Sequence, residues 1–426
     1  MSLSIEHIAK VEGHGKLHVN VNKGEIECVQ MEIFEGARYF EGLVKDRPYN
    51  EVPAVVSRIC GICSQSHLLC SQLAIENALK VRVTKQTKQL RELLMLASLM
   101  QSHVLHLYFL ALPDYLGYDS ALAMAGKYKK EVARALQLKR LANDIVKTIG
   151  GREIHSLTPV IGGFSQLPTQ KDIDHLLKRL KEHKADIEKT AQLFGKLKYP
   201  AFTRKTQYLA LRDKDKIDYL KGNLYTNKTK FTPQKYSKYI TENVVDYSNT
   251  KCVKLKDSEL MVGALARINN NKKYFSRNAK SIINKSKIKF PSNNPYHNNA
   301  AQGFEIVDFY ERMISILKNL KIKDEEPKQV KSRAGHGFSV VEAPRGTLIH
   351  EYEINAKGRI KKANIIAPTT INLANIEEDI KAMLPELMKK TKSKNKIRDE
   401  MEKLIRAYDP CISCSTHFLE LVWNEK

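Results

Sequence analysis

Two Cys-x-x-Cys pairs stand near opposite ends of this 426-residue chain. The first pair is Cys60 and Cys63, and the second is Cys411 and Cys414. A Cys-x-x-Cys turn directs two thiolates at one ion, so the two pairs offer four soft ligands, which on their own suggest zinc or iron. Because almost the whole chain separates the pairs, a shared site requires a fold that brings both ends of the chain to one point.

The residues around the cysteines narrow this choice. The first pair lies in Arg-x-Cys-Gly-x-Cys-x-x-x-His, which ends at His67, and the second in Asp-Pro-Cys-x-x-Cys-x-x-His, which runs from Asp409 to His417. Four further segments lie in the same order: Lys-Val-Glu-Gly-His-Gly at 10–15, Arg-Tyr-Phe-Glu at 38–41, Ala-Pro-Arg-Gly-Thr-Leu-Ile-His at 343–350, and Ala-Pro-Thr-Thr-Ile-Asn at 367–372. From about residue 5 to residue 417 the chain resembles the large subunit of nickel–iron hydrogenases.

The resemblance implies a nickel–iron centre on the four cysteines. Cys60 and Cys411 are the expected terminal nickel ligands, and Cys63 and Cys414 are expected to bridge nickel to iron. The iron would also carry one carbon monoxide and two cyanides, giving a Ni-Fe(CO)(CN)2 centre. His67 is expected to donate a hydrogen bond to a bridging thiolate, as groups around metal ligands do. Taken alone, it would be an ordinary histidine at a helix start.

Heterolytic cleavage of H2 needs a hydride acceptor and a nearby base. The resemblance implies that Cys411 takes the proton and that Glu12 passes it on, although a glutamate before Gly-His could by itself be a surface residue or a cap. Arg345 is expected over the open face of the metal pair, where a guanidinium can assist a substrate. Asp409 is expected to orient it. Alone, an arginine in a Pro-Arg-Gly turn would be interpreted as a salt-bridge partner.

Two further groups of residues follow from the resemblance. Pro368 and Thr369 are expected beside the cyanides, with the hydroxyl and backbone N–H of Thr369 bound to one of them. Glu41 and His417 resemble ligands of a buried magnesium or iron ion.

The chain departs from the family pattern at one place. Many members carry an Asp-His pair where this chain has Gln-Ser-His at 101–103, so Asp409 is expected to supply the acidic group over the site alone. The segments 102–109 and 155–164 are more similar to the cytoplasmic, cofactor-coupled hydrogenases. That subgroup includes sulfhydrogenases, F420-non-reducing hydrogenases and NAD(P)-linked enzymes.

Composition limits the remaining possibilities. Seven cysteines, four of them at metal-binding spacing, argue against a disulfide framework, and Cys28, Cys70 and Cys252 are interpreted as buried or incidental thiols. The net charge of +24 comes with lysines interleaved with acids, which favours a solvated surface, or docking to an acidic partner subunit, over nucleic-acid binding. The N-terminus lacks a signal-peptide pattern and apolar runs stay below roughly 18 residues, which predicts a cytoplasmic protein without a membrane span.

The leading hypothesis is therefore the catalytic subunit of a nickel–iron hydrogenase, which reversibly cleaves H2 into protons and electrons. The chain has no iron–sulfur cluster motif beyond the four cysteines, so it is expected to need an iron–sulfur small subunit. A flavin-containing diaphorase subunit that uses NAD(P) is a further expected partner.

Maturation is also expected, because family precursors are trimmed after the last motif once nickel is in place. Maturation proteins and a C-terminal endopeptidase would remove 418–426, although this tail could equally remain as a docked strand. The alternatives are a regulatory subunit that senses hydrogen, and a coupling subunit like that of respiratory complex I, a relative that has lost the cysteines. A structural zinc site would require neither Glu12 nor Arg345.

Periodicity predicts a single domain over 1–426 that is mainly α with small β elements, an α+β fold in which a long helical bundle holds the metal site between the terminal motifs. Apolar residues spaced by three and four predict helices at 86–111 (stopped by Pro113), 127–148, 169–194, 304–320, 376–390 and 395–407. Alternation predicts a β-hairpin at 15–35, within an N-terminal segment 1–50, and strands at 336–367. The Lys- and Asn-rich region 212–300 is expected to be variable and largely irregular surface.

Overall fold

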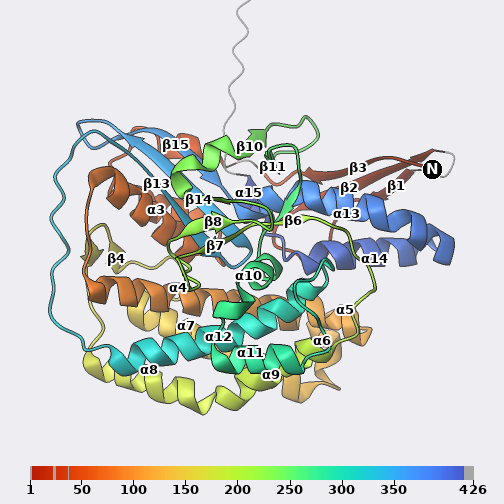
Figure 1. Cartoon of the computed structure of the whole chain (residues 1–426), viewed down its shortest axis with the longest axis horizontal. Helices are drawn as coiled ribbons and strands as arrows, with labels where there is room; N and C mark the ends of the chain where they lie inside the picture. Colours follow the sequence, from red (N-terminus) through yellow and green to blue (C-terminus); the bar gives the residue numbers. More distant parts are fainter. Residues whose placement is uncertain (1, 23–24, 37, 417–426) are drawn as a thin grey trace, which may run out of the picture.

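The computed structural model describes residues 2–22, 25–36 and 38–416. Figure 1 shows a layer of long helices and, above it, a layer of small sheets with further helices. The helices are α1 (Phe40–Leu43), α2 (Val52–Val56), η1 (Ser57–Ile59), α3 (Ser64–Leu79), α4 (Lys85–Leu105), η2 (His106–Ala111), α5 (Leu112–Leu116), α6 (Ala121–Ala125), α7 (Lys129–Gly150), α8 (Gln170–Glu182), α9 (Lys184–Lys196), η3 (Pro233–Lys238), α10 (Ala264–Asn271), η4 (Lys272–Tyr274), α11 (Arg277–Lys285), α12 (His297–Asn319), α13 (Pro368–Lys390), α14 (Lys394–Ala407) and α15 (Ile412–Ser415).

The strands are short except at the two ends of the chain. They are β1 (Ser2–Ile5), β2 (Gly15–Asn22), β3 (Glu25–Ile33), β4 (Pro159–Val160), β5 (Gly163–Phe164), β6 (Gln207–Tyr208), β7 (Ala210–Arg212), β8 (Asn223–Tyr225), β9 (Lys230–Phe231), β10 (Ile240–Asn243), β11 (Cys252–Leu255), β12 (Leu260–Met261), β13 (Gly335–Ala343), β14 (Gly346–Ile354) and β15 (Ile360–Ile366). Antiparallel sheets join β1-β2-β3 and β13-β14-β15. The predicted α+β class and N-terminal hairpin are therefore confirmed.

The helical layer is built on α4, α7 and α12, which pack against one another, with α9 against α12. The side chain of Thr84 caps α4 by accepting a hydrogen bond from the Thr87 N–H, at 3.0 Å. Nearly every residue of α4 from Leu93 to Val104 is buried, and each buried leucine contributes roughly 1.5–3 kcal/mol of transfer free energy. This layer supplies a large part of the main core cluster, to which strands β2, β3 and β14 and helices α3, α13 and α14 also contribute.

The first long helix does not stop at Pro113, which is a correction to the prediction. α4 continues through the π-helical turn η2 into α5, so residues 85–116 form one helical run. Pro113 stands in the first turn of α5, where the missing N–H of proline is tolerated. By length and hydropathy this 32-residue run could cross a membrane, although the apolar runs in the sequence predicted no such helix. However, 83% of its most apolar window is buried inside the protein. It is a core helix.

The predicted helix at 169–194 is two helices, α8 and α9. A capping box between Thr169 and Asp172 starts α8. His183 ends it, with its Nδ1 paired to the Arg179 carbonyl at 2.9 Å. The helix predicted at 376–390 begins earlier, at Pro368, because a proline at the first helical position suits a helix start.

The region 212–300 is more ordered than expected. Strands β7 to β12 and helices α10 and α11 occupy it, and each of these strands has only two to four residues. Their apolar side chains form a separate small core with Val340, Ile349 and Ile371 from the C-terminal half. Strands this short do not show a readable alternation, which explains why the sequence pattern missed them.

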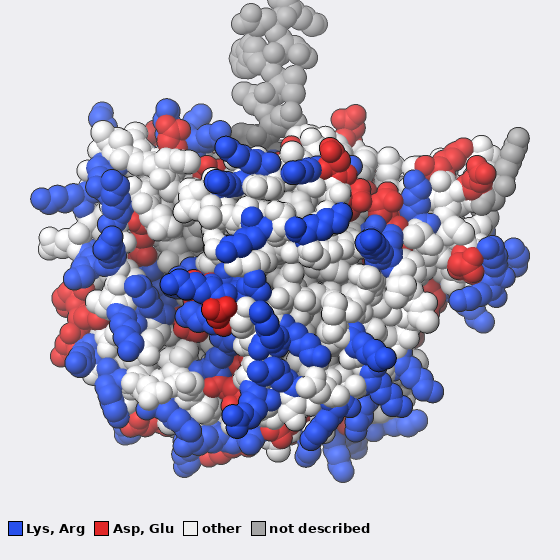
Figure 2. Space-filling model, viewed as in Figure 1, with Lys and Arg blue, Asp and Glu red and all other residues white. Residues whose placement is uncertain are grey.

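The surface is rich in Lys and Arg. On the face drawn in Figure 2 the blue side chains are spread over the molecule and mixed with red ones, without a single basic stripe. This distribution agrees with the solvated surface predicted from the interleaved charges.

Candidate metal centre

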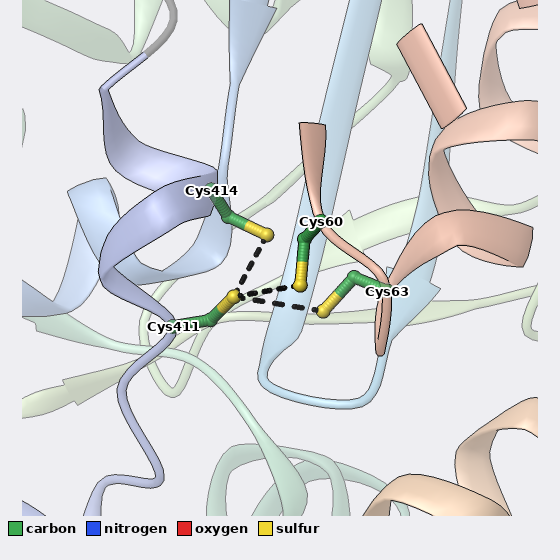
Figure 3. A group of neighbouring side chains, drawn as sticks. All are labelled: Cys60, Cys63, Cys411 and Cys414. Atoms are coloured by element: carbon green, nitrogen blue, oxygen red, sulfur yellow. Dashed lines mark hydrogen bonds between the residues drawn. The ribbon is translucent and has the colours of Figure 1, made fainter. Parts of the chain in front are cut away.

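The four motif cysteines come together in the interior, as Figure 3 shows. Their sulfur atoms all lie within 4.8 Å of one another. Cys411 Sγ is 3.2 Å from Cys60 Sγ, 3.0 Å from Cys414 Sγ and 4.0 Å from Cys63 Sγ. No cysteine of the four is more than 3% exposed. The chain thus closes its two ends onto one point, as the spacing of the motifs requires.

The first pair lies between two helices. Cys60 follows η1 in extended conformation, and Cys63 immediately precedes α3. Arg38 ties this loop to the second motif, because its guanidinium donates to the carbonyls of Ile59 and, at 2.7 Å, of Ser413. The side chain of Arg38 therefore connects the two cysteine loops directly.

The second pair follows α14. Asp409 leaves that helix with a left-handed φ of +53°, a conformation that costs free energy in a residue other than glycine, and Cys411 precedes the short helix α15. The N-terminal segment pairs with this turn through a bridge between Glu12 and Cys411, in which Ile412 N–H donates to the Glu12 carbonyl at 2.8 Å. The Glu-Gly-His segment is thereby fixed against the second motif.

The environment of the thiols favours thiolates on the first pair. Hydrogen bonds from Cys411 and Cys414 hold the pKa of Cys63 well below its ordinary range, and the charge of Arg345 adds to this effect. The pKa of Cys60 is lowered by the same thiol donors. Burial raises the pKa of Cys411 and Cys414. A bound metal ion would override this difference, because a coordinating thiol is deprotonated.

Arg345 reaches the cysteines from a β-hairpin. It lies in the two-residue turn between β13 and β14, where Ala343 pairs with Gly346. Its Nη1 donates to Cys63 Sγ at 3.2 Å, while Nη2 and Nε donate to Oδ1 and the carbonyl of Asp409, both at 2.9 Å. Burial opposes the charge of the guanidinium, but Asp409 and the thiolates raise its pKa well above its ordinary value. Arg345 is thus a fixed cation beside the sulfur cluster.

Two residues to which the sequence motifs assigned no role, Gln302 and His106, hold the side chain of Asp409 in place. Gln302 on α12 donates from Nε2 to Asp409 Oδ2 at 2.9 Å, and its Oε1 lies 2.6 Å from Nδ1 of His106. All three side chains are buried. The guanidinium of Arg345 is therefore the end of a continuous buried polar chain.

Glu12 contacts the cluster on another side. Its Oε2 accepts from Cys411 Sγ at 3.1 Å and from the Ser413 N–H at 3.0 Å. Unlike the cysteines, Glu12 is partly exposed. The carboxylate therefore lies between a buried sulfur and solvent.

The remaining predicted residues adjoin the cysteines less directly. Pro368 and Thr369 form the first turn of α13, and Thr369 Oγ1 accepts from the Cys411 N–H at 2.9 Å. His67 does not bond to a cysteine sulfur in the structure. Its Nδ1 pairs with Nε2 of His350 at 3.0 Å, while its own Nε2 is buried with no partner in the described part of the chain. Burial lowers the pKa of His67 to about 4, so the ring is neutral.

Of the two residues predicted to bind a second metal ion, Glu41 and His417, the structure describes only Glu41. His417 lies outside the described residues. Glu41 is mostly buried, its Oε1 accepts from the Ile365 N–H at 2.8 Å, and burial raises its pKa to about 7. The ammonium of Lys251 lies 3.7 Å from the same oxygen.

Residues 101–103 on α4, where the chain departs from the family pattern, contact groups other than the cysteines. Gln101 bonds to Asn143, and Ser102 Oγ is buried with no partner among the described residues. His103 pairs with a buried carboxylate, Glu305 on α12, at 2.9 Å. Cys28, Cys70 and Cys252 are free thiols, of which Cys70 is buried.

Comparison with known proteins agrees with this geometry. The sequence pattern of the nickel-dependent hydrogenases matches residues 38–140 and 205–417. The chain is 36% identical to the alpha chain of sulfhydrogenase 1 from Pyrococcus furiosus, over 99% of both chains. It is 33% identical to a chain of the vhu F420-non-reducing hydrogenase from Methanocaldococcus jannaschii, over 88% of this chain and 97% of that one. Its structure superposes on an NAD+-reducing [NiFe]-hydrogenase in the H2-reduced state with a TM-score of 0.89 and 25% identity, covering 98% and 99% of the two chains.

The chain belongs to the nickel-dependent hydrogenase family. It is a hydrogenase large subunit, the catalytic subunit of an oxidoreductase that cleaves H2 into protons and electrons. The residues around the cysteines suit the family's metal centre. Four buried sulfurs offer soft ligands, while the Arg345 guanidinium and the His67 Nε2, which has no partner among the described residues, lie ready to interact with the ligands of the metal.

Proposed function

We propose that the four thiolates hold a Ni-Fe(CO)(CN)2 centre, with Cys60 and Cys411 on nickel and Cys63 and Cys414 bridging to iron. The observation that carries this proposal is the convergence of all four buried sulfurs within 4.8 Å, with Arg345 and Glu12 in direct contact with two of them. When bound, such a centre supplies the Lewis acidity and the redox capacity that H2 cleavage requires. A structural zinc site would leave both contacts unexplained.

Glu12 and Cys411 are the proposed proton carriers. The Cys411 sulfur takes the proton released by H2, and Oε2 of Glu12 receives it across the 3.1 Å contact. The Ser413 N–H holds that oxygen in place, which keeps donor and acceptor within the range that proton transfer needs. Because Glu12 is partly exposed, it can pass the proton outward.

Arg345 is the proposed electrostatic anchor above the centre. Its guanidinium is held by Asp409 and faces Cys63, so its donors are directed at the site before substrate arrives. A preorganised buried cation costs no reorganisation during the reaction. Asp409 acts through Arg345, and Gln302 with His106 holds Asp409 in turn.

The diatomic ligands have a suitable neighbour in α13. This helix begins at Pro368 beside Cys411, and the first N–H groups of a helix have no partner within the helix, so they attract anions. Thr369 holds the Cys411 backbone through Oγ1, and Thr370 Oγ1 is buried with no partner in the described residues. We place the cyanides at this helix start, next to Thr369. The buried Nε2 of His67 is the proposed donor to a bridging thiolate.

The partners follow from the chemistry and from the relatives. The four cysteines are the only group of three or more metal-type ligands within the described residues, so electrons need another carrier, and we propose an iron–sulfur small subunit. Relatives named as sulfhydrogenase, F420-non-reducing hydrogenase and NAD+-reducing hydrogenase support a cytoplasmic complex, in which a flavin-containing chain is a further partner. We further propose that the protein requires maturation proteins and an endopeptidase that cleaves the chain after His417.

The test is a paired measurement on the complex produced with its maturation proteins and its small subunit. We expect one nickel per large subunit, together with H2-dependent reduction of a viologen dye, and Cys414→Ser should abolish both. The matched control is Cys70→Ser, which removes a buried thiol outside the cluster. Zinc in place of nickel, with no dye reduction, would contradict the proposal.

A further inference from the structure

Arg267 on α10 is a buried arginine whose guanidinium bonds to two carboxylates and two backbone carbonyls. Its Nε and Nη2 donate to the two carboxylate oxygens of Glu305, at 2.6 and 2.7 Å. Its Nη1 donates to Oε2 of Glu342 and to the Ala343 carbonyl, both at 3.0 Å, and Nη2 also donates to the Pro344 carbonyl at 3.1 Å. A guanidinium has five N–H donors, so each of them has an acceptor here.

The two carbonyls belong to the residues immediately before Arg345. Ala343 and Pro344 lead into the turn between β13 and β14, so this guanidinium holds the backbone from which the Arg345 side chain extends. The start of α10 lies against the same turn. Gly263, which precedes α10, has a φ of +115°, and a β-carbon there would lie 3.1 Å from the Arg345 carbonyl oxygen. A β-carbon on Gly346 would lie 2.6 Å from the Gly263 nitrogen.

Helix α10 is also tied to the segment that carries Asp409. Asn298 on α12 is buried, and its Oδ1 accepts from the Leu265 N–H in the first turn of α10 at 2.9 Å. Its Nδ2 donates to the carbonyl of Ala407, the last residue of α14, at 2.8 Å. Arg345 is therefore held at its side chain by Asp409 and at its backbone by α10, and Asn298 connects these two supports.

Stability alone does not explain a fully buried arginine with two carboxylates. Replacing a buried ion pair by apolar residues of similar volume is often neutral or stabilising. What the planar fork of an arginine provides is a fixed geometry for the groups that it bonds. Burial opposes the charge of Glu305, but Arg267 and His103 hold the pKa of this carboxyl below its ordinary value, so it remains a charged partner for the fork.

We propose that Arg267 is a positioning residue for H2 cleavage, which sets the place of the Arg345 guanidinium beside Cys63 by holding the carbonyls of Ala343 and Pro344. This inference rests on the anchoring role proposed for Arg345. The contact from Arg345 Nη1 to Cys63 Sγ is 3.2 Å, so a small displacement of the turn breaks it. Misplacement of a catalytic group by about 1 Å can cost roughly 100-fold in rate.

The test is Arg267→Lys in the assembled complex. Lysine keeps the positive charge between the two glutamates but has three donors in place of five, so it cannot hold both carboxylates and both carbonyls. We expect full nickel content, a kcat for H2-dependent dye reduction that is roughly 10–100-fold lower, and a shifted carbonyl stretching band, because the charge beside Cys63 moves. Wild-type kcat and an unshifted band in a complex with full nickel would overturn the proposal.

Arg91→Lys is the matched control for the loss of a buried fork. Arg91 is 1% exposed, and it donates to both carboxylate oxygens of Glu76 and to the Val160 carbonyl. Its hydrogen-bond partners among the described residues all lie outside the Arg345 turn. Both variants should lower the melting temperature, but Arg91→Lys should keep the kcat and the carbonyl band of wild type. An equal loss of kcat in Arg91→Lys would overturn the proposal, since any buried fork would then matter alike.

A double-mutant cycle separates positioning from a general structural effect. If Arg267 acts through Arg345, Arg267→Lys should cause little further loss of kcat in an Arg345→Lys complex. The same fold-loss in both backgrounds would overturn the proposal. Wild-type turnover in Arg345→Lys alone would instead contradict the anchoring role, so the two failures are distinguishable. If Arg267→Lys does not assemble, Gly263→Ala replaces it, because its added β-carbon presses on the Arg345 carbonyl, and the same results then decide.

Discussion

Replacing Glu12 by glutamine removes the proposed proton acceptor with little other change. The amide oxygen of glutamine can still accept from the Ser413 N–H, which Glu12 Oε2 now accepts at 3.0 Å. The amide nitrogen can donate to Cys411 Sγ but cannot take a proton from it. The substitution should therefore leave the fold and the metal centre in place, at a cost of no more than about 1 kcal/mol for one altered hydrogen bond.

The expected loss of activity follows from the role of a positioned base. Proton transfer by such a group contributes roughly 10²–10⁴-fold to rate, so H2 oxidation by Glu12→Gln should fall by this factor, or by about 3–5 kcal/mol in the barrier. No other carboxylate contacts the Cys411 sulfur among the described residues, so we expect no efficient substitute.

The assay is H2-dependent dye reduction by the assembled complex, with nickel content measured on the same sample. Glu35→Gln is the matched control, because Glu35 accepts from the His14 N–H at 3.0 Å and so holds the same segment without touching Cys411. It should retain wild-type activity. Glu12→Gln with full nickel and more than about a tenth of wild-type activity would refute the relay role.

Three further outcomes are expected. Arg345→Lys should lose roughly 10²–10³-fold in kcat, because a compact ammonium lacks the planar fork with which the guanidinium reaches the two oxygens of Asp409 and the Cys63 sulfur together. Near-normal turnover would contradict the anchoring role. Gln302→Leu should destabilise the protein by about 1–3 kcal/mol, because it removes the buried donor to Asp409. The kcat of this variant should fall, and Gln302→Glu should not restore it. An unchanged thermal unfolding curve would count against this role of Gln302. Glu377 on α13 accepts a hydrogen bond from the Met31 N–H at 2.8 Å, and burial raises the pKa of its carboxyl to about 7. The stabilisation that the protonated carboxyl gives is therefore present below its ordinary pKa of 4.5 and is lost as pH rises through 7. Glu377→Gln should thus gain up to about 3 kcal/mol over wild type between pH 5 and 8 in thermal unfolding, whereas parallel pH profiles would exclude the effect.

The metal centre could be predicted because its residues are tied to short motifs. The spacing of Cys60 and Cys63, and of Cys411 and Cys414, specifies thiolates that must share an ion, and Arg345 lies in a recognisable Pro-Arg-Gly turn. The structure brings these residues together. The exact bonding of His67 could not be predicted, because its partner His350 comes from a distant strand and nothing in either motif specifies the contact.

Other parts of the site were not readable from the sequence. Gln302 and His106 lie on helices whose periodicity indicates core packing, and only tertiary structure shows that they meet Asp409. Lys251 is one of 71 Lys and Arg residues, in a region of weak periodicity, so its burial has no sequence signal. The Pro113 error has a similar origin, since proline ends a helix or starts one depending on its position in the turn.

The most direct measurement of the central claim is an infrared spectrum of the assembled complex in the carbonyl and cyanide stretching region. We expect bands of one carbonyl and two cyanides in wild type and in Cys70→Ser, and we expect Cys414→Ser to lose them. A spectrum without these bands, from a complex that contains a correctly processed large subunit with its small subunit, would contradict a nickel–iron centre on the four cysteines.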